Sequence, residues 1–222
     1  QADSIKDKED RIKSFTQDIV INKDGTLTIT EDIVVYNNIF GQIKRGIFRD
    51  LKTASRNKGA PKGLVKETHL SSSNQEYSII SVKRDGFNIV YKEVNINDHI
   101  RVYMGSESDN LLENNKEFSY KLKSKVSPQI GIGETEDVLD YYIDGGNWGI
   151  PIQKVVSIIH APTEIKNFSS SNRSNYYSKL QGKNGFTLTT ESNSKKPGYQ
   201  NSPNLAVKVV FVTGFVELPE LS

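Results

Sequence analysis

The sequence contains no cysteine, one methionine and one tryptophan. The absence of cysteine excludes disulfide bonds, thiol nucleophiles and cysteine-ligated zinc. An excess of charge of one sign is also lacking, because 29 Lys and Arg residues face 27 Asp and Glu residues and the formal net charge is only +2. A balance this even gives no global field of the kind that marks nucleic acid as the main partner. Any electrostatic function must therefore be local.

Long hydrophobic runs are missing as well. The two longest apolar stretches, residues 155–159 and 205–212, are far shorter than the roughly 18 to 20 residues that span a bilayer as a helix. The chain opens with Gln1-Ala2 instead of methionine, and we expect an upstream segment such as a signal peptide to have been removed. A chain of 222 residues is long enough for one substantial core. We therefore expect a single domain over residues 1–222, with residues 1–10 flexible or in a short helix.

Alternating apolar residues are the main structural signal. Those around the turn Lys23-Asp24-Gly25 share one parity, namely Ile19, Ile21, Leu27, Ile29, Ile33 and Val35. A three-residue loop at this turn pairs Ile21 with Leu27, whereas a two-residue loop would pair Ile21 with the polar Thr28. The spacing predicts a three-residue hairpin loop whose glycine is left-handed.

Two further hairpins are predicted by the same reasoning. Lys183-Asn184-Gly185 repeats the three-residue pattern, which would set Leu180 opposite Leu188. Asp85-Gly86 fits a two-residue loop, because that loop pairs Val82 with Ile89.

The strand pattern continues along the chain, and no segment sustains a long helical period. Apolar and polar residues alternate over 100–104 and 118–126, as in strands with one buried face. β-branched and aromatic residues are nearly continuous over 155–159 and 205–212, as in strands covered on both faces. We predict an all-β fold, an antiparallel two-sheet β-sandwich with long loops. The long loops are expected at residues 53–73 and 169–175. The predicted core contains Ile19, Ile21, Leu27, Ile29, Val155, Ile159, Val207, Val209 and Phe211.

Several motifs resemble a known family when their order and spacing are taken together. They are Arg45-Gly-Ile-Phe-Arg-Asp-Leu51, Ile100-Arg-Val-Tyr-Met-Gly105, the strand Glu117 to Val126, and Gly145-Gly-Asn-Trp-Gly-Ile-Pro-Ile152. The chain resembles, from about residue 11 to 218, the N-terminal extracytoplasmic domain of the bacterial membrane-protein family catalogued as domain of unknown function 2207. The resemblance implies a domain on the extracytoplasmic face of the bacterial plasma membrane, with transmembrane helices beyond residue 222. It implies no activity.

Positive charge is concentrated between residues 44 and 66. The basic residues there are Lys44, Arg45, Arg49, Lys52, Arg56, Lys58, Lys62 and Lys66, against the single acid Asp50. Near a bilayer, Arg56, Lys58 and Lys62 would contact anionic lipid or a wall polymer, each charge contributing about 1 kcal/mol. The alternative is an ordinary solvated loop. Arg45, Arg49 and Asp50 are candidates for a structural ion pair that pins the loop to a sheet.

Aromatic residues near a glycine-rich turn are the candidate ligand-binding residues. They are Trp148, Asn147, Tyr141 and Tyr142, which would form a stacking platform for sugars. The alternative is that Trp148 fills the core and its indole N–H reaches a backbone carbonyl.

An acidic stretch precedes these aromatics, comprising Glu134, Glu136, Asp137, Asp140 and Asp144. It suggests a calcium site, a carboxylate pair for glycoside hydrolysis, or a solvated strand edge. The calcium-loop pattern is absent, and the three histidines are scattered without ligand spacing.

These observations favour an uncharacterised extracytoplasmic binding or scaffolding domain of a membrane-anchored bacterial protein. We expect no cofactor, metal, catalytic residue or nucleic-acid partner. The expected partners are the protein's own transmembrane segment and another envelope or membrane protein. The alternative is a cell-envelope carbohydrate-binding module or carboxylate-based glycan hydrolase, which requires the aromatics and carboxylates to meet in one exposed cleft.

Overall fold

A computed structural model of the protein describes residues 9–38, 43–54, 75–106, 111–143, 148–171, 176–183, 185–194 and 205–217. Within these ranges the chain forms strands and turns, and no helix there is long and apolar enough to cross a bilayer. The strands are β1 (Arg11–Ile21), β2 (Leu27–Asn37), β3 (Ile47–Lys52), β4 (Tyr77–Arg84), β5 (Phe87–Asn88), β6 (Tyr91–Ile96), β7 (His99–Met104), β8 (Lys116–Val126), β9 (Ile130–Gly131), β10 (Glu136–Tyr142), β11 (Lys154–His160), β12 (Ile165–Ser171), β13 (Tyr176–Lys183), β14 (Thr187–Ser194) and β15 (Ala206–Val212).

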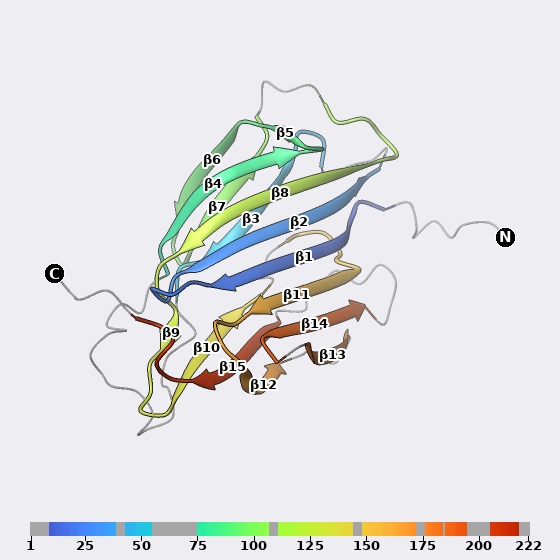
Figure 1. The fold of residues 1–222 in the computed structure, drawn as a ribbon. Coiled ribbons are helices and arrows are strands. Elements are labelled where there is room, and N and C mark those ends of the chain that lie inside the picture. The colour runs from blue at the N-terminus through green and yellow to red at the C-terminus, as the bar shows by residue number, and fades with distance from the viewer. Residues whose placement is uncertain are drawn as a thin grey trace.

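The strands build two layers. One layer is an eight-stranded sheet of order β13-β14-β11-β1-β2-β8-β4-β5. The other layer consists of a three-stranded sheet, β3-β7-β6, and a four-stranded sheet, β12-β15-β10-β9, which Figure 1 shows behind the two halves of the large sheet. The predicted all-β, sandwich-like fold is confirmed. Among the described strands the pairing is antiparallel except between β1 and β11, which run parallel although more than a hundred residues separate them.

The core lies between the layers, and all nine predicted core residues are buried. Strands β2 and β8 alternate strictly between buried and more exposed positions, which is the period of a strand with one covered face. The prediction of cover on both faces holds for most of β15 but is wrong for β11, where Val156 and Ile158 are only half-buried. Only one face of β11 meets the second layer, so its apolar run does not correspond to two-sided burial.

The hairpins at Gly25 and Asp85-Gly86 form as predicted. Ile21 pairs with Leu27, and Gly25 has a φ of 80°. The two-residue loop sets Arg84 opposite Phe87, and both loop residues have positive φ.

The register predicted for the β13–β14 hairpin is wrong. Gly185 has the expected positive φ, of 71°, but Leu188 pairs with Gly182 instead of Leu180, and Lys183, expected in the loop, pairs with Thr187 in the ladder. The segment between β11 and β12 explains the shift. The backbone N–H groups of residue 161, just after β11, and of residue 165, where β12 begins, donate to the carbonyls of residues 186 and 185. Local parity contains no information on these tertiary contacts.

The predicted loop at 169–175 is also partly wrong, since residues 169–171 belong to β12 and pair with β15. The rest of that loop, and most of the loop predicted at 53–73, lie outside the described residues.

Candidate functional site

A buried ion pair joins the two layers. Glu31 has the same parity on β2 as its apolar neighbours Ile29 and Ile33, so its carboxylate points into the core. Arg49 on β3 reaches it with two nearly parallel bonds, Nε to Oε1 at 2.9 Å and Nη2 to Oε2 at 2.8 Å. The two side chains are 3% and 2% exposed. We call Glu31 and Arg49 the core ion pair.

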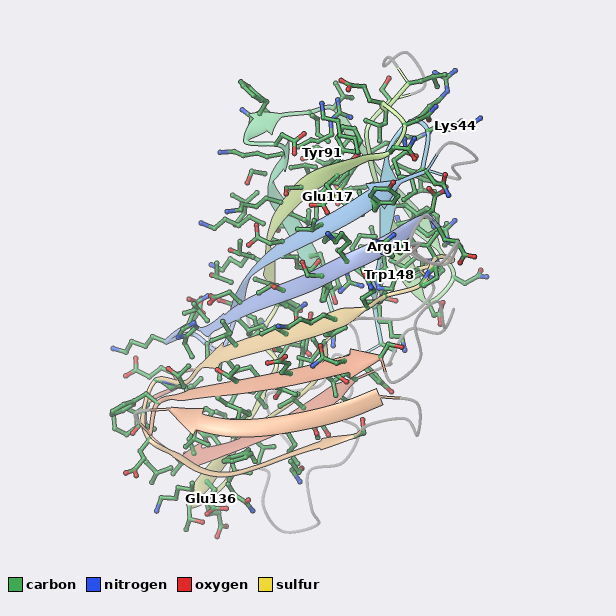
Figure 2. The ribbon with its side chains drawn as sticks, turned by 90° about the vertical axis from the view of Figure 1, so that its right-hand side faces the viewer. Arg11, Lys44, Tyr91, Glu117, Glu136 and Trp148 are labelled. Atoms are coloured by element: carbon green, nitrogen blue, oxygen red, sulfur yellow. The ribbon has the colours of Figure 1, made fainter. Side chains whose placement is uncertain are left out.

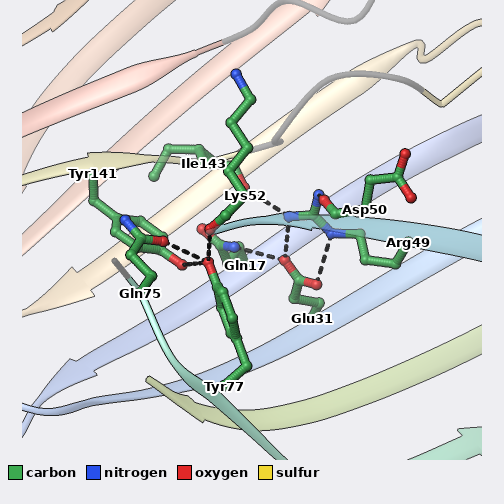
Figure 3. A network of polar contacts seen from close by, with 9 residues as sticks. All are labelled: Gln17, Glu31, Arg49, Asp50, Lys52, Gln75, Tyr77, Tyr141 and Ile143. Atoms are coloured by element: carbon green, nitrogen blue, oxygen red, sulfur yellow. Dashed lines mark hydrogen bonds and ion pairs between the residues drawn. The ribbon is translucent and has the colours of Figure 1, made fainter. Parts of the chain in front are cut away.

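The remaining polar atoms of the core ion pair are also bonded. Gln17 Nε2 donates to Glu31 Oε2 at 2.6 Å, and Arg49 donates to the carbonyl oxygens of Asp50 and Ile143 at 2.8 and 3.2 Å (Figure 3). Buried charges stabilise a fold only when their bonding capacity is satisfied in this way. The contacts fix the three-stranded sheet on the large one.

Aromatic rings enclose the guanidinium of the core ion pair. Its carbon lies 5.1 Å from the ring centroid of Phe15 and 5.2 Å from that of Trp148, and these two rings meet edge to face at 5.5 Å. Trp148 is 6% exposed. It therefore serves the core, where it shields the ion pair from water.

Two tyrosines continue the polar network toward the four-stranded sheet. The Tyr77 hydroxyl lies 3.0 Å from the carbonyl oxygen of Lys52 and 3.3 Å from the hydroxyl of Tyr141 (Figure 3). Burial raises the pKa of Tyr77 to about 12, although its bond to Tyr141 acts in the opposite direction. Burial likewise raises the pKa of Tyr141. Both phenols therefore stay protonated at neutral pH.

A second ion pair lies on the other face of the three-stranded sheet. Arg101 on β7 binds Asp50 on β3 with two bonds of 2.8 and 2.9 Å. These bonds are the main reason that the pKa of Arg101 is raised. The Arg101 guanidinium also lies 4.0 Å from the ring centroid of Phe48, and His99 Nε2 is 3.3 Å from the same carboxylate of Asp50. The outer face of this sheet is thereby held in one arrangement.

The predicted trio of Arg45, Arg49 and Asp50 is therefore divided among different contacts. Arg49 pairs with Glu31 and Asp50 pairs with Arg101. Successive residues of a strand point to opposite faces, so Arg49 and Asp50 could not both address the core. Arg45 precedes β3 and is exposed.

A hollow of about 840 Å³ opens on the outer face of the three-stranded sheet. We call it the outer hollow. Its lining comprises Arg45, Gly46, Ile47, Phe48, Val90, Lys92, Val94, Tyr103, Met104, Gly105 and Ser106. The rings of Phe48 and Tyr103 stand side by side, with centroids 6.2 Å apart. The surface is thus aromatic and apolar, with basic side chains at its margin.

The candidate stacking platform does not form an exposed surface. Tyr141 is 3% exposed, and Trp148 is buried as described above. Tyr142 is half-buried with Lys52 Nζ 4.1 Å from its ring centroid, and Asn147 lies outside the described residues.

Within its described part, the acidic stretch is divided between the two faces of β10, because the buried Asp137 points to the opposite face from Glu136 and Asp140. Asp137 is fully buried, which raises its pKa, and Asp144 lies outside the described residues. Glu136 lies at the end of the molecule opposite Tyr91 (Figure 2). Among the described residues, no three His, Asp or Glu side chains come together as metal ligands would.

Two features of the site were not predicted from the sequence. Glu31 stands in a row of apolar residues on one face of β2, and a charged residue in such a row predicts a buried partner of opposite charge. The outer hollow combines three separate segments and carries no comparable local pattern. The basic loop residues Arg56, Lys58 and Lys62 lie outside the described residues.

A known protein family matches most of the chain. Residues 11–205 match the family described as the predicted membrane protein (DUF2207) N-terminal domain. The chain belongs to the DUF2207 family. No curated protein matches it.

Solved structures are similar to this DUF2207 domain at very low sequence identity. Leukotriene A4 hydrolase from Saccharomyces cerevisiae is 6% identical with a TM-score of 0.52, and the match covers 92% of this chain and 29% of the hydrolase. An M1 zinc metallopeptidase from Deinococcus radiodurans is 10% identical with a TM-score of 0.42, and the match covers 91% of this chain and 42% of the peptidase. The chain thus spans less than half the length of either protein. The first similarity shows a related fold alone, and the second is too weak to support an argument.

Proposed function

We propose that this DUF2207 domain is an extracytoplasmic binding domain of a membrane-anchored protein, and that its ligand occupies the outer hollow. The observation that carries the proposal is the hollow itself. Its volume of about 840 Å³ lies within the range of about 300 to 1,000 Å³ that small-molecule sites occupy. Family membership supports the membrane context, because the family is that of a predicted membrane protein.

The lining indicates the chemistry of the ligand. Phe48 and Tyr103 present rings, Val90 and Val94 present aliphatic surface, and Lys92 adds positive charge. No acidic side chain occurs among the described residues of the lining. The hollow therefore suits a molecule, or a protruding segment of a partner, that combines an apolar or aromatic group with a negative charge.

The lining is also preorganised, which favours binding. Arg101 is held by Asp50 and lies against Phe48, so the aromatic wall rests on an ion pair. The core ion pair fixes the same sheet from its inner side. A site whose side chains are already ordered loses less conformational entropy when a ligand binds.

Cysteine labelling of the full-length protein in intact cells tests the orientation. The 222 residues contain no cysteine, so Ser78→Cys, at an exposed position on β4, adds a single thiol to this domain. A membrane-impermeant maleimide should label it without cell lysis. Ser157→Cys, at a fully buried position on β11, is the matched control and should stay unlabelled. Labelling of Ser78→Cys only after lysis would place the domain on the cytoplasmic side.

Anilinonaphthalene sulfonate, which is aromatic and anionic, is a suitable probe for the hollow. Its fluorescence should rise on binding, and Tyr103→Ala and Lys92→Gln should each weaken the binding several-fold. Phe186→Ala is the control, because Phe186 is also an exposed ring but does not line the hollow. Equal effects of Tyr103→Ala and Phe186→Ala would show nonspecific dye binding and would contradict the proposed site.

A further inference from the structure

A row of lysines runs along β8 on the outer face of the eight-stranded sheet. Alternate residues of β8 are buried from Phe118 to Val126, and the residues between them are exposed. Lys121, Lys123 and Lys125 therefore project from one face, away from the core, at intervals of ~7 Å. We call these three residues the lysine row.

Hydroxyl side chains stand on both sides of the row. The cross-strand neighbours are Thr30 and Ser81 for Lys123, and Thr28 and Ser78 for Lys125. None of these four neighbours is aromatic or acidic. Ammonium and hydroxyl groups both donate hydrogen bonds, so the strip is rich in donors. Negative charge is present at its two ends, where Asp32 lies beside Lys121 and Asp24 is close enough to Lys125 to interact with its charge.

The positive charge of the row is only partly compensated within the chain. Lys121 lies 3.5 Å from Asp32 on one side, but on the other side it is directly opposite Lys83 of β4. In the part of the chain that the structure describes, neither Lys83 nor Lys123 forms an ion pair. Like charges directly opposite each other destabilise a sheet. An anionic partner would reverse that effect.

We propose that the lysine row binds a linear polyol phosphate, a chain of phosphodiesters joined by short polyols. Phosphate oxygens accept hydrogen bonds from both ammonium and hydroxyl groups, and the ionised acceptor strengthens these bonds. A three-carbon phosphodiester unit in extended form has a repeat comparable with the spacing of the row, so successive phosphates meet successive lysines.

The surroundings of the row exclude broader or base-bearing partners. Four carboxylates occupy the outer face of the same sheet, namely Glu117 on β8 itself, Asp32 on the neighbouring β2, Asp18 on β1 and Glu191 on β14. A flat anionic bilayer laid on this face would meet all four carboxylates, whereas a single chain that follows β8 between residues 121 and 125 would meet only Asp32 among them, and Asp32 is already paired with Lys121. Single-stranded nucleic acids are held largely by stacking of bases on aromatic rings, which the neighbours of Lys123 and Lys125 lack.

Fluorescence anisotropy with end-labelled poly(glycerol phosphate) tests the proposal on the 222-residue chain. The polymer should bind at low salt and dissociate as salt rises, because binding releases counterions. The variant Lys123→Gln/Lys125→Gln should bind roughly tenfold more weakly and show a smaller dependence on salt, since two phosphate contacts are lost. A thermal melt of the variant should be unchanged, because both side chains are exposed.

The matched control is Lys13→Gln/Lys154→Gln, which removes the same charge. These lysines lie on strands of the same sheet but already pair with Glu117 and Glu191. Their loss should change affinity by no more than about twofold, because exposed pairs contribute little. Equal weakening in both double variants would show that net charge alone is responsible and would overturn the proposal.

Two other probes complete the test. Vesicles rich in phosphatidylglycerol and single-stranded oligothymidine should bind more weakly than the polymer and should be insensitive to the Lys123→Gln/Lys125→Gln change. Tighter binding of either probe through the same lysines would assign the row to a membrane or a nucleic acid instead. Absence of polymer binding at low salt would also overturn the proposal.

Discussion

Loss of either member of the core ion pair should destabilise the domain strongly. Arg49→Met leaves the carboxylate of Glu31 buried without a cation, and Glu31→Leu leaves the guanidinium in the same position. Each change removes the two charged hydrogen bonds between these side chains, worth about 1.5 to 3 kcal/mol apiece, which agrees with the roughly 3 to 5 kcal/mol expected when a buried pair is broken. Glu31→Leu also removes the bond from Gln17, and Arg49→Met also removes the bonds to the carbonyl oxygens of Asp50 and Ile143. The free energy of unfolding should therefore fall by about 3 to 5 kcal/mol in each single variant.

The double variant Glu31→Leu/Arg49→Met should be less destabilised than the sum of the single changes. It leaves no unpaired charge, and the new side chains would pack against Phe15 and Trp148. We expect a coupling free energy of about 3 kcal/mol, measured by urea unfolding at neutral pH in a double-mutant cycle.

Lys154→Met supplies the surface control for this cycle. Lys154 lies 3.2 Å from Glu191, but the two side chains are 44% and 38% exposed. Its loss should cost less than about 1 kcal/mol. A loss of stability as small as this in Glu31→Leu and Arg49→Met would refute the claim that the pair fixes the two layers. So would losses in the two single variants that sum to the loss in the double variant within about 0.5 kcal/mol.

Three further results are expected. The stabilisation that arises from the raised pKa of Tyr77 should be fully present below pH 10 and lost as the pH rises toward 12, a change of up to about 3 kcal/mol that Tyr77→Phe should abolish in urea melts. Gly46→Ala should destabilise the domain by about 2 to 4 kcal/mol in the same assay, because its φ is 131° and a Cβ atom would lie 2.1 Å from the carbonyl oxygen of Met104. Arg101→Met should weaken binding of anilinonaphthalene sulfonate, because it frees Phe48, and should also lower the free energy of unfolding by about 3 kcal/mol, because it leaves the buried carboxylate of Asp50 without its bidentate partner; a loss of stability without a loss of binding would contradict the role of Arg101 in the hollow.

Local patterns were sufficient to predict the all-β class and the pairing in two of the three hairpins. The parity around Gly25 determined both the loop length and the pairing of Ile21 with Leu27. The same argument failed at Gly185. The turn there accepts backbone hydrogen bonds from residues 161 and 165, and the alternation of apolar residues along one hairpin gives no information about contacts with another part of the chain. The parallel pairing of β1 with β11 is similarly non-local, so no short-range pattern could reveal it.

The candidate site was less predictable for the same reason. Arg49 and Asp50 were identified as ion-pair residues, but their partners Glu31 and Arg101 lie on other strands, and partner choice depends on which faces the sheets present. Trp148 follows two glycines in the sequence, which suggested an exposed platform, but its ring is buried against Phe15, as in the alternative of a tryptophan that fills the core. The lining of the outer hollow comes from β3, β6 and β7 and the residues beside them, so no single stretch of sequence could predict it.

Ligand protection of a single thiol tests the central claim most directly. Val90→Cys places a thiol in the lining of the outer hollow, at a position that is 66% exposed, in a domain that has no other cysteine. In intact cells that make the full-length protein, an impermeant maleimide should label this thiol, and anilinonaphthalene sulfonate should slow the labelling while leaving Ser78→Cys unaffected. Labelling of Val90→Cys only after lysis would contradict the extracytoplasmic orientation, and labelling at the same rate with and without the probe would contradict binding in the hollow.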